Sequence, residues 1–184
     1  MSVQRGFGSI IAAIIGIVIL AVTVVIIVKV MTGEPPIKAI IYKTSELRRA
    51  TAPLERANLI TDLDDLVVEA NNDDVKEQWD RMTQCLAAGC PDEAYLDMIL
   101  VTVAAFEQDI PESALLINII ATAKYWDKPE NLLDFSKALS IANEQIQSLD
   151  NRKIEKIWTQ IVECNGVCPE KNSLYFELIG AIVQ

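Results

Sequence analysis

Two stretches of the chain carry the same pattern of tryptophan, cysteine and proline, and this repetition limits the folds open to it. The segment Lys76-Glu77-Gln78-Trp79 through Cys85 to Cys90-Pro91-Asp92 parallels Glu155-Lys156-Ile157-Trp158 through Cys164 to Cys168-Pro169-Glu170. The tryptophans stand 79 residues apart, as do Cys85 and Cys164, and the same offset pairs Ile60 with Leu139, Leu63 with Ala142, Val67 with Ile146 and Val75 with Ile154. A duplicated unit of this length fits about four helices arranged as two hairpins.

Apolar residues recur three and four positions apart from Ile37 onward, without a convincing run of period two, which predicts an all-α body. Proline marks the first turn of several helices. We expect about eight helices, near 37–50, 53–71, 73–88, 91–108, 111–126, 129–148, 151–165 and 169–183. The short connections force antiparallel neighbours, as in an α-solenoid or a bundle.

The predicted domain organisation has three parts. Residues 1–30 form a transmembrane anchor, and residues 31–52 form a stem with the first helix. Residues 53–184 form the duplicated domain, with copies at about 53–110 and 129–184 linked by the strongly apolar helix 111–126. The fold expected from the sequence is therefore a single N-terminal transmembrane helix followed by a helical-repeat domain.

No charged residue occurs from Gly8 to Val28, and these residues are long enough to cross a bilayer core of about 30 Å as a helix. The sequence thus predicts a single-pass membrane protein that contacts lipid through residues 8–28. Gly8, Ala12 and Gly16 recur every fourth residue, a spacing that lets a second helix approach closely. These small residues suggest a homo-oligomer formed through the transmembrane helix.

The residues Arg5-Gly6-Phe7, followed directly by the apolar run, resemble the processing site of type IV prepilins and their archaeal relatives. The resemblance implies cleavage between Gly6 and Phe7 and a mature N-terminal helix that packs in the core of a filament. Ile11 stands where many pilins carry Glu, and Pro35-Pro36 interrupt the helix. An uncleaved signal anchor is therefore the preferred interpretation, with a pilin-like subunit as the alternative.

The four cysteines form two close pairs, Cys85 with Cys90 and Cys164 with Cys168, each flanking a turn that contains glycine. Each pair brackets a tight corner between helices, where two Cα atoms come close enough for a disulfide. A four-thiolate zinc site and four reduced cysteines are the alternatives. Disulfides imply an extracytoplasmic body. Basic residues just beyond the apolar run favour a cytoplasmic body instead, and we give the cysteines more weight.

The chain carries 26 acidic and 16 basic residues and has a net charge of -10. All of this negative charge belongs to the part beyond the anchor, and an acidic surface repels nucleic-acid phosphates. We therefore expect no nucleic-acid partner. The chain contains no histidine, so histidine-based catalysis and histidine metal ligation are excluded.

Other residue groups are better explained by structure than by chemistry. Asp62, Asp64 and Asp65 precede Asn71 and Asn72, but a calcium loop also needs a glycine and a closing glutamate at fixed offsets, so we expect a solvated helix face and an N-cap. We expect core positions for the aromatic residues Trp79, Trp126, Trp158 and Tyr125. No phosphate-binding loop, nucleophile elbow or paired-carboxylate motif is found, so we expect neither an enzyme nor a cofactor or metal.

The function expected from the sequence is that of a membrane-anchored, extracytoplasmic helical-repeat protein with a structural or protein-binding role. The alternatives are a pilin-like filament subunit and a cytoplasm-facing membrane adaptor.

Overall fold

The computed structural model describes residues 36–125, 132–164, 168 and 170–184. The chain divides into two compact units, residues 1–34 and residues 35–184, and we call the second unit the body. The predicted anchor at 8–28 lies outside the described residues, as do the predicted processing residues Gly6 and Phe7 and the packing residues Gly8, Ala12 and Gly16. No helix among the described residues is long and apolar enough to cross a membrane.

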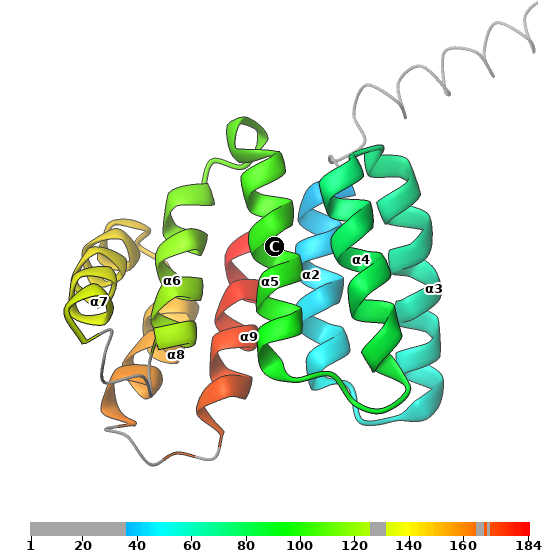
Figure 1. Cartoon of the computed structure of the whole chain (residues 1–184). Helices are drawn as coiled ribbons and strands as arrows, with labels where there is room; N and C mark the ends of the chain where they lie inside the picture. Colours follow the sequence, from blue (N-terminus) through cyan, green and yellow to red (C-terminus); the bar gives the residue numbers. More distant parts are fainter. Residues whose placement is uncertain (1–35, 126–131, 165–167, 169) are drawn as a thin grey trace, which may run out of the picture. The chain divides into compact units, whose positions relative to one another are not determined.

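The body is a packed bundle of α-helices, which confirms the predicted all-α fold (Figure 1). Eight α-helices and one short 3₁₀ helix are present in the described residues: α2 (Pro36–Arg49), α3 (Pro53–Ala70), α4 (Asp73–Leu86), α5 (Asp92–Ala105), η1 (Glu107–Asp109), α6 (Ser113–Tyr125), α7 (Leu132–Ser148), α8 (Arg152–Glu163) and α9 (Lys171–Val183). The expected helices differ from these by a few residues at their ends.

Four helices, α2, α5, α6 and α9, form the centre of the bundle, and the hairpins α3–α4 and α7–α8 lie outside them (Figure 1). Helix α2 packs against α3, α5 and α9, and α6 packs against α7, α5 and α9. The central helices supply side chains with no exposed surface, among them Ile40, Ile41, Ile99, Leu116, Ile119 and Ile179. The hydrophobic core therefore lies where these four helices meet.

The first helix of the body is an integral part of this core. Residues 31–52 were predicted to form a stem with the first helix; that helix is α2, whose Ile37, Ile40 and Ile41 are buried and which belongs to the body by its contacts. Similarly, the helix expected to link the two copies, α6, packs in the second half of the body as α2 packs in the first.

The two halves of the body, α2–α5 and α6–α9, share details at the offset of 79 residues. Asn71 and Asp150, just after α3 and α7, both adopt the left-handed conformation, with φ of 47° and 48°. The next residues, Asn72 and Asn151, are both N-caps whose side chains accept backbone N–H groups of the following helix. A polar side chain at this position satisfies donors that a helix start leaves free. The same sequence pattern therefore builds the same turn twice.

The two repeated tryptophans also make equivalent hydrogen bonds. Trp79 Nε1 donates to Asp64 Oδ1 over 2.6 Å, and Trp158 Nε1 donates to Asn143 Oδ1 over 3.1 Å. The acceptors, like the donors, stand 79 residues apart. Each tryptophan ring is 3% exposed, so these bonds satisfy the one polar group of a buried side chain. The predicted core positions of Trp79 and Trp158 are confirmed, while Trp126 lies outside the described residues.

In the last helix of each half the offset becomes 80 residues. It pairs Tyr95 with Tyr175, Ile99 with Ile179 and Val103 with Val183, and all six are buried. At this offset Gly180 takes the place of Leu100. A Cβ atom at Gly180 would lie 2.9 Å from Ser45 Oγ, so the glycine lets α9 approach α2 closely.

The contacts between helices keep their pattern when the two halves are exchanged. The pair α2–α9 corresponds to α6–α5, and the pair α2–α5 corresponds to α6–α9. The two halves therefore face each other with the same helices. We infer that the duplicated unit contains four helices.

Because Asp64 and Asn143 perform the same task, we expect Asp64→Asn to preserve the hydrogen bond to Trp79 and to change the free energy of unfolding little. Asp64→Ala removes the acceptor and is expected to lower that free energy by about 1 kcal/mol. Urea unfolding followed by tryptophan fluorescence measures both. Asp65→Ala is the matched control, since Asp65 is an exposed neighbour on the same helix. Equal losses for Asp64→Ala and Asp65→Ala would contradict the assigned role.

Candidate functional site

The four cysteines form two disulfides within the described residues, Cys85–Cys90 and Cys164–Cys168. Their Cα atoms are 4.9 Å and 5.6 Å apart, within the range that disulfides require. The disulfide interpretation is thus supported over the zinc and free-thiol alternatives. Disulfides of this kind are typical of proteins that fold in an oxidising, extracytoplasmic environment.

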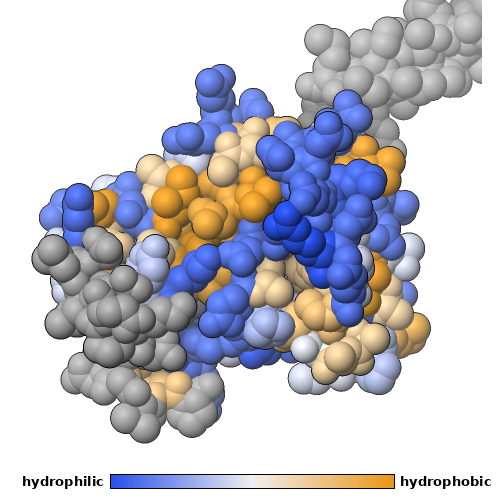
Figure 2. Space-filling view, viewed as in Figure 1, coloured by the Kyte–Doolittle hydropathy of each residue, from blue (hydrophilic) through white to orange (hydrophobic). Residues whose placement is uncertain are grey.

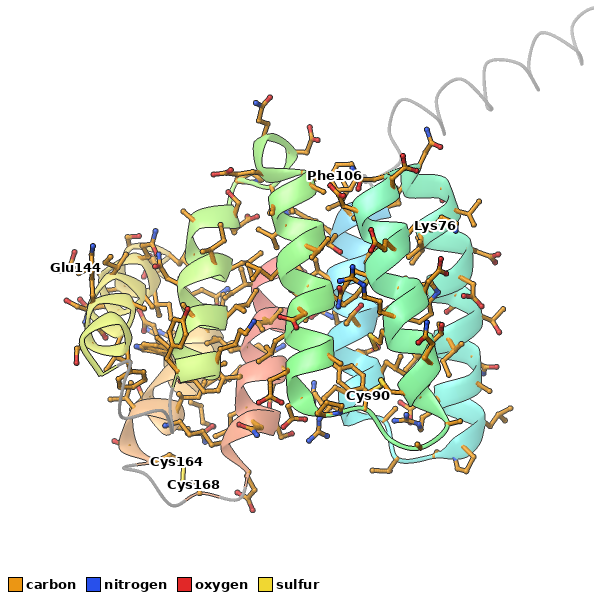
Figure 3. All side chains as sticks on the ribbon, viewed as in Figure 1. Lys76, Cys90, Phe106, Glu144, Cys164 and Cys168 are labelled. Atoms are coloured by element: carbon orange, nitrogen blue, oxygen red, sulfur yellow. A yellow bond between two sulfur atoms is a disulfide. The ribbon has the colours of Figure 1, made fainter. Side chains whose placement is uncertain are left out.

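Each disulfide closes a corner that joins an outer helix to a central one. Cys85–Cys90 spans the turn from α4 to α5, and Cys164–Cys168 spans the turn from α8 to α9. The glycine of the first turn, Gly89, has φ of 90°, a left-handed conformation that favours glycine, while Gly166 of the second turn lies outside the described residues. Both corners lie at one end of the body, and Phe106 lies at the other (Figure 3).

The acidic residues considered as a calcium site have structural partners or face solvent. Asp62 pairs with Lys43 over 2.6 Å, Asp64 accepts from Trp79, and Asp65 is exposed. Asn72 acts as the N-cap of α4, as expected. Among the residues that the structure describes, no three cysteine or carboxylate side chains are grouped so as to hold a metal ion.

A shallow groove of about 370 Å³ runs between α4 and α5. Its α5 side is apolar and is formed by Val101, Ala104 and Ala105. Its α4 side consists of polar side chains, namely Asp74, Glu77, Gln78 and Arg81. Figure 2 shows these two kinds of surface side by side, with hydrophobic residues gathered over α5 and α6 and hydrophilic residues over α4.

The outer arc of α4 that borders this groove is acidic, and the corresponding arc of α8 is basic. We call these the acidic α4 surface (Asp73, Asp74, Glu77, Asp80 and Arg81) and the basic α8 surface (Arg152, Lys153, Lys156, Thr159 and Gln160). The members correspond one to one at the offset of 79 residues, and all are exposed. Their formal charges sum to -3 and +3. Two other corresponding pairs carry charge of the opposite sign to their surface or none: Lys76 of α4 corresponds to Glu155 of α8, and Gln84 of α4 corresponds to the exposed Glu163 of α8.

Part of this charge has no partner within the body. On α4, Glu77 pairs with Arg81 and Asp80 pairs with Lys76. Within the described part of the chain, Asp73 and Asp74 form no salt bridge, and neither do Arg152, Lys153 and Lys156. On these two surfaces the charges without a salt bridge therefore lie in the first turn of α4 and in the first two turns of α8.

Helix stability explains the acids of α4 but not the bases of α8. Asp73 and Asp74 stand in the first turn of α4, where negative charge is stabilised by the exposed N–H groups. Arg152 and Lys153 stand in the first turn of α8, where positive charge is destabilising for the same reason. The basic residues of α8 thus oppose the local preference of the helix they begin.

Sequence analysis found the cysteine corners but missed these two surfaces. Along the chain each surface is a run of mixed charge on a helix, which is typical of any solvated face. The signal becomes visible when polar residues, and not only apolar ones, are compared at the repeat offset. The inversion of Asp74 to Lys153 and of Glu77 to Lys156 then stands out.

Comparison of the chain with protein-family models, with curated proteins and with solved structures gives no significant match. Functional inference therefore starts from the residues of this chain.

Two buried groups of α9 have shifted pKa values. Burial lowers the pKa of Lys171, which is 3% exposed, to about 7. Burial also raises the pKa of the Tyr175 hydroxyl to about 12, so this tyrosine stays neutral at physiological pH. Of these two groups, Lys171 is the one whose charge changes near neutral pH.

We expect the burial of Lys171 to make the free energy of unfolding depend on pH, and the variant Lys171→Met to lack this dependence. In the unfolded chain a lysine titrates near pH 10.4, so between pH 7 and pH 10 the unfolded state binds more protons than the folded state. The free energy of unfolding of the wild type should therefore rise relative to Lys171→Met over this interval, by at most about 1.4 kcal/mol per pH unit. The exposed Lys137→Met is the control. A difference that stays constant with pH would contradict the assignment.

The unfavourable charges of α8 give a second prediction. Arg152→Glu/Lys153→Glu should raise the free energy of unfolding by about 1 kcal/mol at low ionic strength, because it places negative charge at a helix N-terminus. The mirror variant Asp73→Lys/Asp74→Lys should lower it by a similar amount. Urea unfolding at low protein concentration measures both changes. Destabilisation by the α8 variant would show that Arg152 and Lys153 support the fold after all.

Proposed function

We propose that the chain is a single-pass membrane protein whose extracytoplasmic, disulfide-linked helical body has a structural or protein-binding role. The observation that carries this proposal is the pair of disulfides at corresponding corners of a duplicated unit. Disulfides are typical of compartments that keep thiols oxidised, which supports an extracytoplasmic location for the body.

Membrane attachment is supported by the sequence. The uncharged residues 8–28 match the length of a transmembrane helix, and the first body helix begins only a few residues further on at Pro36. In this proposal the anchor attaches the body to the membrane, and the disulfides stabilise the body outside the cell's reducing interior.

A binding role, and not catalysis, is supported by the kind of surface that the body presents. Duplicated helical units expose long helix faces suited to contact with other proteins. The groove between α4 and α5 combines an apolar side on α5 with a polar and charged side on α4, which is the composition of a protein-binding surface more than of a deep ligand site.

Thiol counting in the native membrane tests the location. Alkylation under non-reducing, denaturing conditions should label none of the four cysteines, and alkylation after reduction should label all four. A Cys168→Ser variant provides the matched control. It should add a single reactive thiol at Cys164, whereas a reactive thiol at Cys85 or Cys90 would show that the disulfides are rearranged. Four reactive thiols in the wild type would overturn both the disulfides and the extracytoplasmic assignment.

Carbonate extraction and intact mass test the anchor. The wild type should remain in the membrane pellet, and Ile15→Arg/Ile19→Arg should release it, since each arginine in the middle of a span is costly. Met31→Arg, beyond the apolar run, is the control.

The intact mass of the protein should include residues Met1 to Gly6. A mature chain that begins at Phe7 would favour the pilin-like alternative.

A further inference from the structure

We propose that this chain binds a second copy of itself head to tail, with the acidic α4 surface of one molecule against the basic α8 surface of the next. The inference deepens the protein-binding role proposed above by naming the partner. It rests on the charges of the two surfaces, on their positions in the body and on the groove beside α4.

The first step is charge complementarity at corresponding positions. The two surfaces have the same backbone framework, because α4 and α8 occupy equivalent places in the two halves. The five positions that define each surface carry charges that sum to -3 on α4 and to +3 on α8, and over all their residues α4 carries -2 and α8 carries +1. Surfaces of opposite charge steer two molecules together and fix their register.

The second step is the position of the surfaces. Helices α4 and α8 lie on opposite sides of the body, separated by the central helices (Figure 1). One molecule therefore cannot satisfy its own α4 surface with its own α8 surface. Contact between different surfaces on opposite sides is heterologous, so it leaves one free surface of each kind and continues from molecule to molecule as a chain or a ring.

The third step is that several charges of the two surfaces form no salt bridge within the body. Asp73 and Asp74 on α4 and Arg152, Lys153 and Lys156 on α8 form no salt bridge in the described residues. The bases of α8 also stand where their own helix disfavours positive charge. A partner that brings carboxylates to this helix end removes that conflict.

The groove gives the contact an apolar component. Val101, Ala104 and Ala105 line it beside Asp74 and Glu77. On the opposite side of the body, α8 carries Val162, which is 42% exposed, close to Thr159 on the basic surface. Burial of such groups adds an attraction that salt does not screen.

Zero-length carbodiimide cross-linking tests the contact directly, since it joins a carboxylate to an amine only where the two touch. The full-length protein in detergent micelles is used as an equal mixture of unlabelled and ¹⁵N-labelled chains. We expect peptides that join Asp73, Asp74 or Glu77 of one isotope to Lys153 or Lys156 of the other, and a ladder of bands beyond the dimer. Absence of these mixed-isotope peptides, or a dimer without higher bands, would overturn the proposal.

Charge-swap variants sharpen the test. Lys153→Glu/Lys156→Glu should reduce the ladder at least tenfold, and Asp74→Lys/Glu77→Lys should do the same. An equal mixture of the two variants should recover it, because every contact in the mixture again joins opposite charges. The variant with all four changes should also recover it. Failure of both recoveries would contradict charge complementarity even if each single-surface variant loses association.

Two further variants separate this contact from other effects. Asp65→Lys/Glu69→Lys makes a similar charge change on exposed residues of α3 and should leave the ladder intact.

Gly8→Ile/Gly16→Ile alters the predicted packing strip of the transmembrane segment and should leave the Asp74–Lys153 cross-link intact. Loss of the cross-link in this variant would place the association in the membrane segment instead. The thiol count and carbonate extraction are unaffected by the swaps, so failure of this proposal and failure of the proposed function are distinguishable.

Discussion

The packing of the two halves against each other through α2, α5, α6 and α9 is the interaction on which the body depends. A unit of four short helices buries too little apolar surface to be stable by a wide margin, and two such units with a shared core bury more per residue. Phe176 of α9 illustrates the shared core, because its ring contacts Tyr95 of α5 edge to face, with centroids 6.1 Å apart.

Polar contacts at the edge of this core fix the same helices. Arg48 of α2 pairs with Asp92 of α5, and Asn172 of α9 donates to the other oxygen of that carboxylate over 2.6 Å. The Arg48 guanidinium also lies over the Phe176 ring, 5.9 Å from its centroid. The Asp92 carboxylate thus links three of the four central helices. It accepts one charged and one neutral donor, and it stays partly exposed to water.

The helices were predictable because each one is marked by local chemistry, whereas the extent of the repeated unit was not. Trp79 and Cys85 are rare residue types, so their recurrence identifies α4 and α8. Helices α2 and α6 match only through residues such as Ile40 and Ile119, which any buried helix contains. In α5 and α9 the change of offset from 79 to 80 separates Tyr95 from Tyr175, so the strongest match there is missed at a fixed spacing.

The disulfide corners were predictable for the same reason, since cysteine, glycine and proline each restrict the backbone at a helix turn. The charged surfaces were not, because a charge on a solvated helix has no local consequence that distinguishes it from its neighbours. Only the duplicated framework supplies a reference. Once Asp74 and Lys153 are known to occupy the same structural position, the difference between them needs a reason outside the local structure.

Duplication by itself produces two like surfaces on opposite sides of a body, and two like acidic surfaces repel each other. In the proposed head-to-tail contact, inverting the charge on one side converts this repulsion into attraction between molecules without altering the core, because the five inverted positions are exposed. The disulfides are compatible with such a contact, since they lie at one end of the body and α4 and α8 present their sides. By joining α4 to α5 and α8 to α9, they hold each surface in place on the central helices, so an approaching molecule meets charges that are already positioned.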